Sequence, residues 1–132
     1  MSPKDRIYKK GYAKELHSVA HNDYLAARAL SQHPEVRGET VLFMVQQAIE
    51  KGLKSVLGHL GRSIPMTRNL YGLVQRLGDE NQPPYSEELE ELTPYATIRR
   101  YEEGRFEITN EDIQNSLTIA ESILDWCQTR IS

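Results

Sequence analysis

The sequence predicts an all-α fold, an antiparallel bundle of four to five helices. Apolar residues recur at three- and four-residue steps in successive stretches of the chain, and no stretch shows the alternation of a strand convincingly. The links between these stretches are short, which is typical of antiparallel neighbours. A chain of 132 residues can bury one sizeable core. We therefore expect a single domain over residues 1–132, with its core at about 11–131.

The first helix is predicted over about residues 11–30. It should end before His33, because the residue that precedes a proline is disfavoured in helical geometry. On a helical wheel His17, His21 and Arg28 lie opposite an apolar stripe. That stripe consists of Tyr12, Leu16, Val19, Ala20, Ala27 and Leu30.

The second helix is predicted from Glu39 to His59, and its apolar arc is unusually broad. Such a helix is either central in its bundle or shared with a partner subunit. Gly52 falls within this arc, where the missing side chain allows another helix to approach closely. The apolar arc consists of Val41, Leu42, Met44, Val45, Ala48, Ile49, Leu53, Val56 and Leu60, and the remaining polar ridge of Gln46, Gln47, Glu50, Lys51 and Lys54.

Two shorter helices and a long one follow. Thr67 can cap a short helix that stops at Gly78, and its apolar positions are Leu70, Leu73, Val74 and Leu77. A fourth helix begins near Ser86 and is bent or interrupted at Pro94. The last helix follows a capping arrangement of Thr109 and Asp112. Its apolar positions are Ile113, Leu117, Ala120, Leu124, Cys127 and Ile131.

Composition indicates a soluble, cytoplasmic protein. There is no long apolar run, and the basic N-terminal segment has no apolar stretch behind it, so neither a spanning helix nor a secretory signal is expected. The net charge of −3 argues against broad binding to nucleic acids. Cys127 stands alone, so it is interpreted as an ordinary half-buried thiol.

Several common chemical motifs are absent or weak. There is no glycine-rich phosphate loop, no G-x-S-x-G elbow and no cysteine-centred nucleophile. His17 and His21 are four residues apart and could both ligate a metal, but the spacing alone is weak. We interpret them as two solvated histidines and predict no metal and no cofactor. The carboxylate pairs in EELEEL and YEEG are interpreted as solubilising residues.

Four segments in register carry a family resemblance. They read A20-H-N-D-Y-L-A-A27, F43-M-V-Q-Q-A-I-E-K-G-L-K-S-V-L57, P65-M-T-R-N-L70 and L92-T-P-Y-A-T-I-R-R-Y101. With this order and spacing, residues 12–130 resemble the HEPN family of small helical domains. The resemblance implies a bundle of four to five helices, frequently a homodimer, and often a partner of the minimal nucleotidyltransferase type. It also implies either nucleotide binding or, in a toxin branch, metal-independent RNA cleavage.

The RNA-cleaving branch needs an arginine followed, after four to six residues, by a histidine near the last helix. A histidine moves protons and an arginine steadies the phosphate. The matching region here is R99-R-Y-E-E-G-R-F106, in which no histidine follows the arginines. A literal match, R28-A-L-S-Q-H33, lies in another part of the chain and is interpreted as accidental. No catalytic residue is therefore assigned, and a non-enzymatic function is favoured.

Asp23 is the most unusual residue of the first helix, because the wheel places it within the apolar stripe. An unpaired buried carboxylate is very costly, so we expect a cationic partner from Lys51, Lys54, Arg99 or Arg100. The cluster is either an ion pair that sets helix register or, with Gln47 and Tyr101, a cleft for phosphate or a partner. The candidate nucleotide- or partner-binding residues are Asp23, Gln47, Lys51, Lys54, Arg99, Arg100 and Tyr101.

Three functions follow from these observations. The first is a non-catalytic interaction module, dimeric through the broad arc of the second helix, that partners a nucleotidyltransferase-type protein. The second is a nucleotide-binding domain. The third is a metal-independent ribonuclease toxin of a toxin–antitoxin pair, which the missing histidine disfavours.

Overall fold

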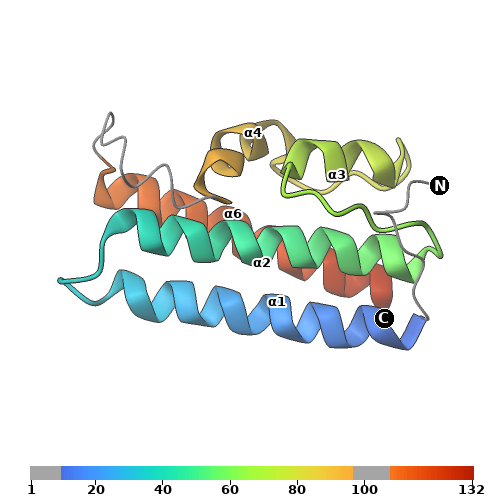
Figure 1. The fold of residues 1–132 in the computed structure, drawn as a ribbon, viewed down its shortest axis with the longest axis horizontal. Helices are drawn as coiled ribbons and strands as arrows, with labels where there is room; N and C mark the ends of the chain where they lie inside the picture. Colours follow the sequence, from blue (N-terminus) through green and yellow to red (C-terminus); the bar gives the residue numbers. More distant parts are fainter. Residues whose placement is uncertain (1–9, 97–107) are drawn as a thin grey trace.

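The protein is an all-helical bundle in its computed structural model, which describes residues 10–96 and 108–132. Within these ranges no strand occurs, and the predicted fold class is confirmed. Three long helices form one bundle: α1 (Lys10–Ser31), α2 (Gly38–His59) and α6 (Asn110–Ile131). Helix α1 runs antiparallel to the other two, whereas α2 and α6 run in the same direction (Figure 1).

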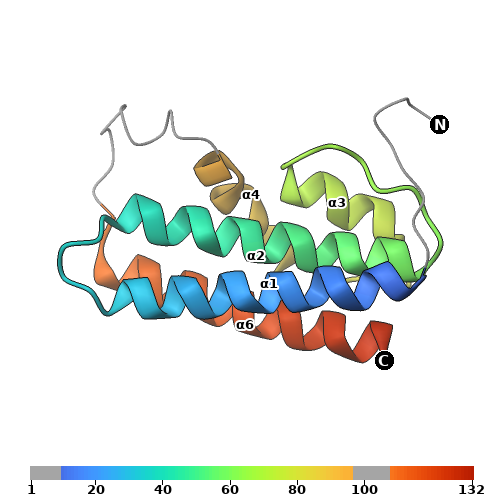
Figure 2. The ribbon, with the colours of Figure 1, turned by 60° about the horizontal axis from the view of Figure 1, so that its bottom comes forward.

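A second, shorter layer covers the side of α2 that faces away from α1. It contains α3 (Leu70–Leu77), η1 (Ser86–Glu88), α4 (Leu89–Leu92) and η2 (Thr93–Ala96). These segments carry the chain back along α2, which is why α6 can start near the same end as α2 (Figures 1 and 2). Helix α2 contacts α1, α3, η2 and α6, so it is the central helix.

The buried face of α1 agrees only in part with the predicted stripe, of which Ala20 and Ala27 are buried as predicted. Tyr12 and Val19 are 38% and 44% exposed, whereas His17 and Tyr24 are buried. The face turned inward carries Ala13, Ala20 and Ala27, whose small side chains let the helix approach its neighbours closely. Because α1 packs against α2 and α6 through these alanines, His17 is buried as well. The interpretation of two solvated histidines is therefore wrong for His17.

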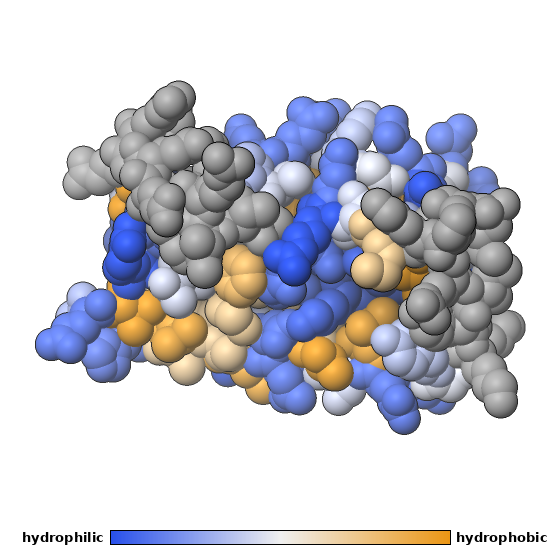
Figure 3. Space-filling view, viewed as in Figure 1, coloured by the Kyte–Doolittle hydropathy of each residue, from blue (hydrophilic) through white to orange (hydrophobic). Residues whose placement is uncertain are grey.

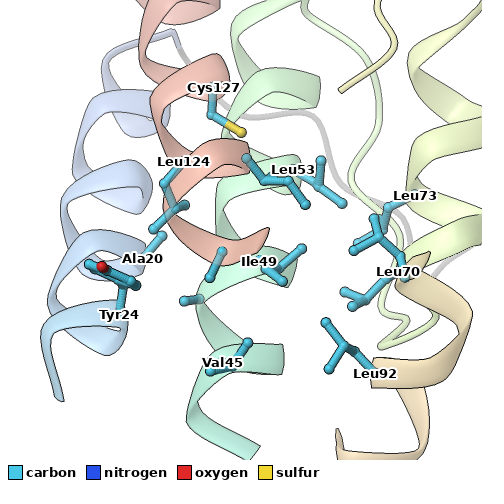
Figure 4. Packing of buried hydrophobic residues seen from close by; sticks show 14 of the residues in the cluster. Ala20, Tyr24, Val45, Ile49, Leu53, Leu70, Leu73, Leu92, Leu124 and Cys127 are labelled. Carbon is cyan, nitrogen blue, oxygen red and sulfur yellow. The ribbon is translucent and has the colours of Figure 1, made fainter. Parts of the chain in front are cut away.

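The broad apolar arc of α2 is covered within a single chain. Leu42, Ile49 and Leu53 are all buried, and Figure 4 shows Ile49 and Leu53 pointing toward the α3–α4 layer and α6. The central position therefore accounts for the arc, and most of it is not left for a partner subunit. These buried residues therefore no longer support a dimer contact through α2. The dimer itself stays a prediction.

Gly52 marks the closest approach of α2 to α6. A Cβ atom added there would lie 2.6 Å from Cδ2 of Leu124 and 3.4 Å from Sγ of Cys127. Leu124 is itself a core residue, 3% exposed. This confirms the packing role predicted for the glycine.

The ends of the shorter helices are set by local hydrogen bonds. Asn69, not Thr67, caps α3, and its side chain accepts from the main-chain N–H of Gly72. Thr67 instead accepts from the N–H of Asn69, one step earlier. Gly78 ends the helix, as predicted, and the structure gives it a positive φ of 84°. The interruption predicted at Pro94 is the change from α4 to the 3₁₀ turn η2.

Candidate functional site

The candidate site is the polar ridge of α2, defined as Gln46, Gln47, Glu50, Lys51 and Lys54. Seen from the side of Figure 1, hydrophilic residues form a band across the middle of the molecule, with hydrophobic residues on both sides (Figure 3). Two members of the ridge are nevertheless buried, since Gln46 is 0% and Glu50 is 7% exposed. The ridge is therefore a partly internal polar cluster.

One half of the cluster faces α1. The ammonium group of Lys51 donates to Oδ2 of Asp23 at 2.7 Å. The two side chains are 29% and 17% exposed, so the ion pair is half-buried. The cationic partner predicted for Asp23 is thus present, and it is Lys51 rather than Lys54.

The other half faces the segment that leads into α3. Lys54 donates to Oε2 of Glu50 at 3.0 Å, and the amide of Gln46 donates to Oε1 of Glu50 at 3.2 Å. The same amide group lies 3.0 Å from the main-chain oxygen of Arg68 and donates to it. Gln47 donates to Oε1 of Gln46 at 2.7 Å. These bonds tie the start of the α3 layer to the central helix.

The cluster is electrostatically balanced. Each of the two lysines has a carboxylate within 3.0 Å, so neither ammonium group presents an uncompensated charge. Among the described residues no buried side-chain nitrogen or oxygen lacks a hydrogen-bond partner. An arrangement so fully paired suits the setting of helix register better than the capture of a phosphate, which needs available positive charge.

Sequence reasoning assigned only part of this cluster to the candidate site. It assigned Gln47, Lys51 and Lys54, which lie on the ridge, and Asp23 of α1, which pairs with Lys51. It placed Gln46 and Glu50 on the ridge as well, but it did not count these two buried members among the candidate binding residues. Their signal is the four-residue spacing from Gln46 to Glu50 and from Glu50 to Lys54, which aligns side chains on one helix face. Arg99, Arg100 and Tyr101 lie outside the described residues.

The two residues of the literal arginine–histidine match, Arg28 and His33, make different local contacts. The guanidinium group of Arg28 lies over the ring of Tyr24, 5.6 Å from its centre. His33 follows the end of α1, where its Nδ1 atom accepts from the main-chain N–H of Glu35 at 3.2 Å. Both side chains have separate roles in local structure, which agrees with an accidental match.

Two further observations bear on the class of protein. Within residues 10–96 and 108–132, no group of three or more histidine, cysteine, aspartate or glutamate side chains is arranged around a common metal position. No helix in the same ranges has the length and apolar character needed to cross a membrane.

Comparison with known proteins returns one family. The model of the HEPN domain matches residues 13–130, which is nearly the whole chain. No curated protein and no solved structure matches it.

Proposed function

The chain belongs to the HEPN domain family, and from this we propose that it is a non-catalytic interaction module that binds a protein of the nucleotidyltransferase type. The observation that carries the proposal is the internal pairing of the polar ridge. The two lysines of the ridge each pair with a carboxylate, Lys51 with Asp23 and Lys54 with Glu50. The ridge therefore has a structural role, and the partner protein binds the surface beside it.

That surface contains exposed apolar side chains next to the anchored segment. The amide of Gln46 donates a hydrogen bond to the main-chain oxygen of Arg68. Met66, two residues before Arg68 in the chain, is 73% exposed. Tyr71, in the first turn of α3, is 37% exposed. Protein interfaces combine such apolar and aromatic anchors with a polar rim, which the outer edge of the ridge supplies.

A homodimer is part of the proposal, and it is supported by the family resemblance alone. The covered arc of α2 no longer argues for it, although Leu60, at the C-terminal end of that helix, is 38% exposed. Analytical ultracentrifugation at micromolar concentration should give twice the mass of one chain. A monomer at that concentration would remove the dimer from the proposal without affecting partner binding.

Nucleotide binding is a weaker candidate for this ridge. A phosphate would have to compete with Asp23 for Lys51 and with Glu50 for Lys54, at the cost of leaving a half-buried carboxylate unpaired. We expect calorimetric titration with ATP or GTP to show no saturable heat. A saturable signal that disappears in Lys51→Ala would favour nucleotide binding over the interaction module.

Partner binding is tested by co-expression with a minimal nucleotidyltransferase from the same genome. The wild-type chain should co-purify with it, and Met66→Asp and Tyr71→Asp should each lose it, because a charge would enter the apolar contact. Val19→Asp is the matched control, since Val19 is an exposed apolar residue on α1, on the other side of α2. If wild type retains no such partner, or all three variants retain it equally, the proposal is wrong.

A further inference from the structure

A groove lies between α1 and α6, away from the polar ridge of α2. It has a volume of about 370 Å³ and is lined by Lys14, His17, Ser18, His21, Leu124, Asp125 and Gln128. A second hollow of about 240 Å³ shares His21, Leu124 and Asp125 with it, so the two are adjacent. The proposed module makes no use of this groove.

His17 forms part of the wall of this groove and has one ring nitrogen committed. The residue is only 9% exposed, and Nε2 lies 3.0 Å from the main-chain oxygen of Leu124. A carbonyl oxygen can only accept, so Nε2 must carry the hydrogen. In the neutral ring the other nitrogen, Nδ1, therefore holds a lone pair.

The second ring nitrogen of His17 keeps contact with solvent. Among the described residues, Nε2 makes the one hydrogen bond of the His17 ring, and no buried side-chain nitrogen lacks a partner. Nδ1 is therefore reached by solvent rather than sealed in the core. Its direction is fixed, because the Leu124 carbonyl on the neighbouring helix holds the ring.

A histidine in this state is prepared to ligate a metal. Metal-binding histidines typically donate their second ring N–H to a backbone carbonyl or a carboxylate, which fixes the tautomer and orients the free nitrogen. His21 is one helical turn further along α1 on the same groove wall, a spacing at which two imidazoles can share one ion. Asp125, on the α6 wall, has no hydrogen-bond or salt-bridge partner among the described residues and supplies negative charge.

We propose that His17 and His21 form a two-histidine site for a divalent transition-metal ion in the α1–α6 groove, with Asp125 as the countercharge. The described residues hold no three-ligand cluster, so water completes the coordination shell. Imidazole ligands favour zinc, nickel and copper over magnesium and calcium, and the usual order of affinity puts Cu²⁺ first.

The test is calorimetric titration of the full chain with ZnCl₂, NiCl₂ and CuCl₂, with MgCl₂ as a comparison. Wild type should bind one transition-metal ion per chain and no magnesium, with copper tightest. His21→Ala, an exposed position that leaves the core intact, should weaken binding by at least about tenfold. The control is the double variant His33→Ala/His59→Ala, which removes the other two of the four histidines and should bind as wild type does.

His17→Ala would remove a buried hydrogen bond and could unfold the protein. The role of His17 is therefore tested by spectroscopy on the wild type instead of by substitution. In long-range ¹H–¹⁵N spectra, Zn²⁺ should shift Nδ1 of His17 while Nε2 stays protonated. The proposal is overturned if wild type binds no transition metal, if His21→Ala binds like wild type, if the double variant loses binding, or if Nδ1 of His17 does not respond.

Discussion

The ammonium group of Lys51 lies 2.7 Å from the carboxylate of Asp23, and this pair joins the middle of α1 to the middle of α2. Both side chains keep some contact with solvent, since 29% of Lys51 and 17% of Asp23 is exposed. The pair is therefore neither a surface ion pair, which contributes up to about 1 kcal/mol, nor a fully buried one, whose disruption costs about 3–5 kcal/mol.

Replacing Asp23 should destabilise the protein by an intermediate amount. We expect Asp23→Ala to lower the free energy of unfolding by about 1–2 kcal/mol, because Lys51 is left half-buried without a countercharge. Urea unfolding measures this, and the double variant with Lys51→Ala isolates the coupling. Glu80→Ala is the control, since the Arg62–Glu80 pair is 3.6 Å long with Glu80 75% exposed. Asp23→Ala that unfolds like wild type would show that the pair contributes nothing.

A methyl group at position 52 should destabilise the contact of α2 with α6. In Gly52→Ala the new Cβ would lie 2.6 Å from Leu124, so the core must shift at a cost of about 1–3 kcal/mol. The gain in helix propensity offsets about 1 kcal/mol of this. Gly11→Ala, on the exposed side of α1 with nothing within 4 Å, should instead be neutral or stabilising. Thermal unfolding of both variants makes the comparison, and equal shifts would contradict the close approach.

The capping box of α6 should make stability fall in acid. The main-chain N–H of Thr109 donates to Oδ2 of Asp112 at 2.9 Å, and this bond lowers the pKa of Asp112 below its ordinary value of 3.8. A carboxyl with a lower pKa in the folded state binds fewer protons there, so its stabilisation is present above that ordinary value and is lost as pH falls through the folded pKa.

Asp112→Asn tests this pH dependence, because asparagine can accept the same hydrogen bond without titrating. The difference in unfolding free energy between wild type and variant should shrink as the pH falls from about 6 to about 2. An NMR titration of the side chain should give a midpoint below 3.8. A difference that stays constant over this range would mean that the cap does not depend on charge.

Cys127 should be unreactive while the protein is folded. Burial raises the pKa of its thiol far above the ordinary range, and the thiolate is the form that attacks disulfide reagents. Ellman's reagent at mildly alkaline pH should label denatured protein fully and native protein only at the rate of unfolding. Rapid labelling of native protein, at a rate that stabilisation of the fold does not slow, would contradict the burial.

The purified chain should not cleave single-stranded RNA at a useful rate. No histidine follows Arg99 or Arg100, and loss of a general acid–base group removes a factor of about 10²–10⁴. A fluorescent RNA substrate provides the assay. Cleavage that disappears in His33→Ala would make the arginine–histidine match at residues 28–33 the real site and would favour the ribonuclease toxin.

Local signals in the chain were sufficient for most of the helices. The stop before His33, the end at Gly78 and the capping box of Thr109 and Asp112 each depend on a few neighbouring residues, and each is where it was predicted. Even the cap of α3 was misplaced by only two residues, from Asn69 to Thr67, because both side chains accept main-chain hydrogen bonds there.

The candidate site could be predicted only in part. A carboxylate in an apolar stripe demands a cation, so the pairing of Asp23 was foreseeable from sequence, but the choice among several lysines and arginines depends on how two helices are aligned. The burial of Gln46 was not foreseeable, because its amide is satisfied by the main chain at Arg68, twenty-two residues away.

The sequence by itself determined the helical class, the family and the absence of a histidine after Arg99 and Arg100, because periodicity, motif order and residue identity are properties of the chain. Only the tertiary structure decided which face of α1 is turned inward. The wheel placed Val19 in one stripe with Ala20 and Ala27. Close packing against α2 and α6 instead turns Ala13, Ala20 and Ala27 inward, takes His17 inside with them and leaves Val19 exposed. A contact between helices depends on side-chain volume at one place, and no average along a single helix contains that information.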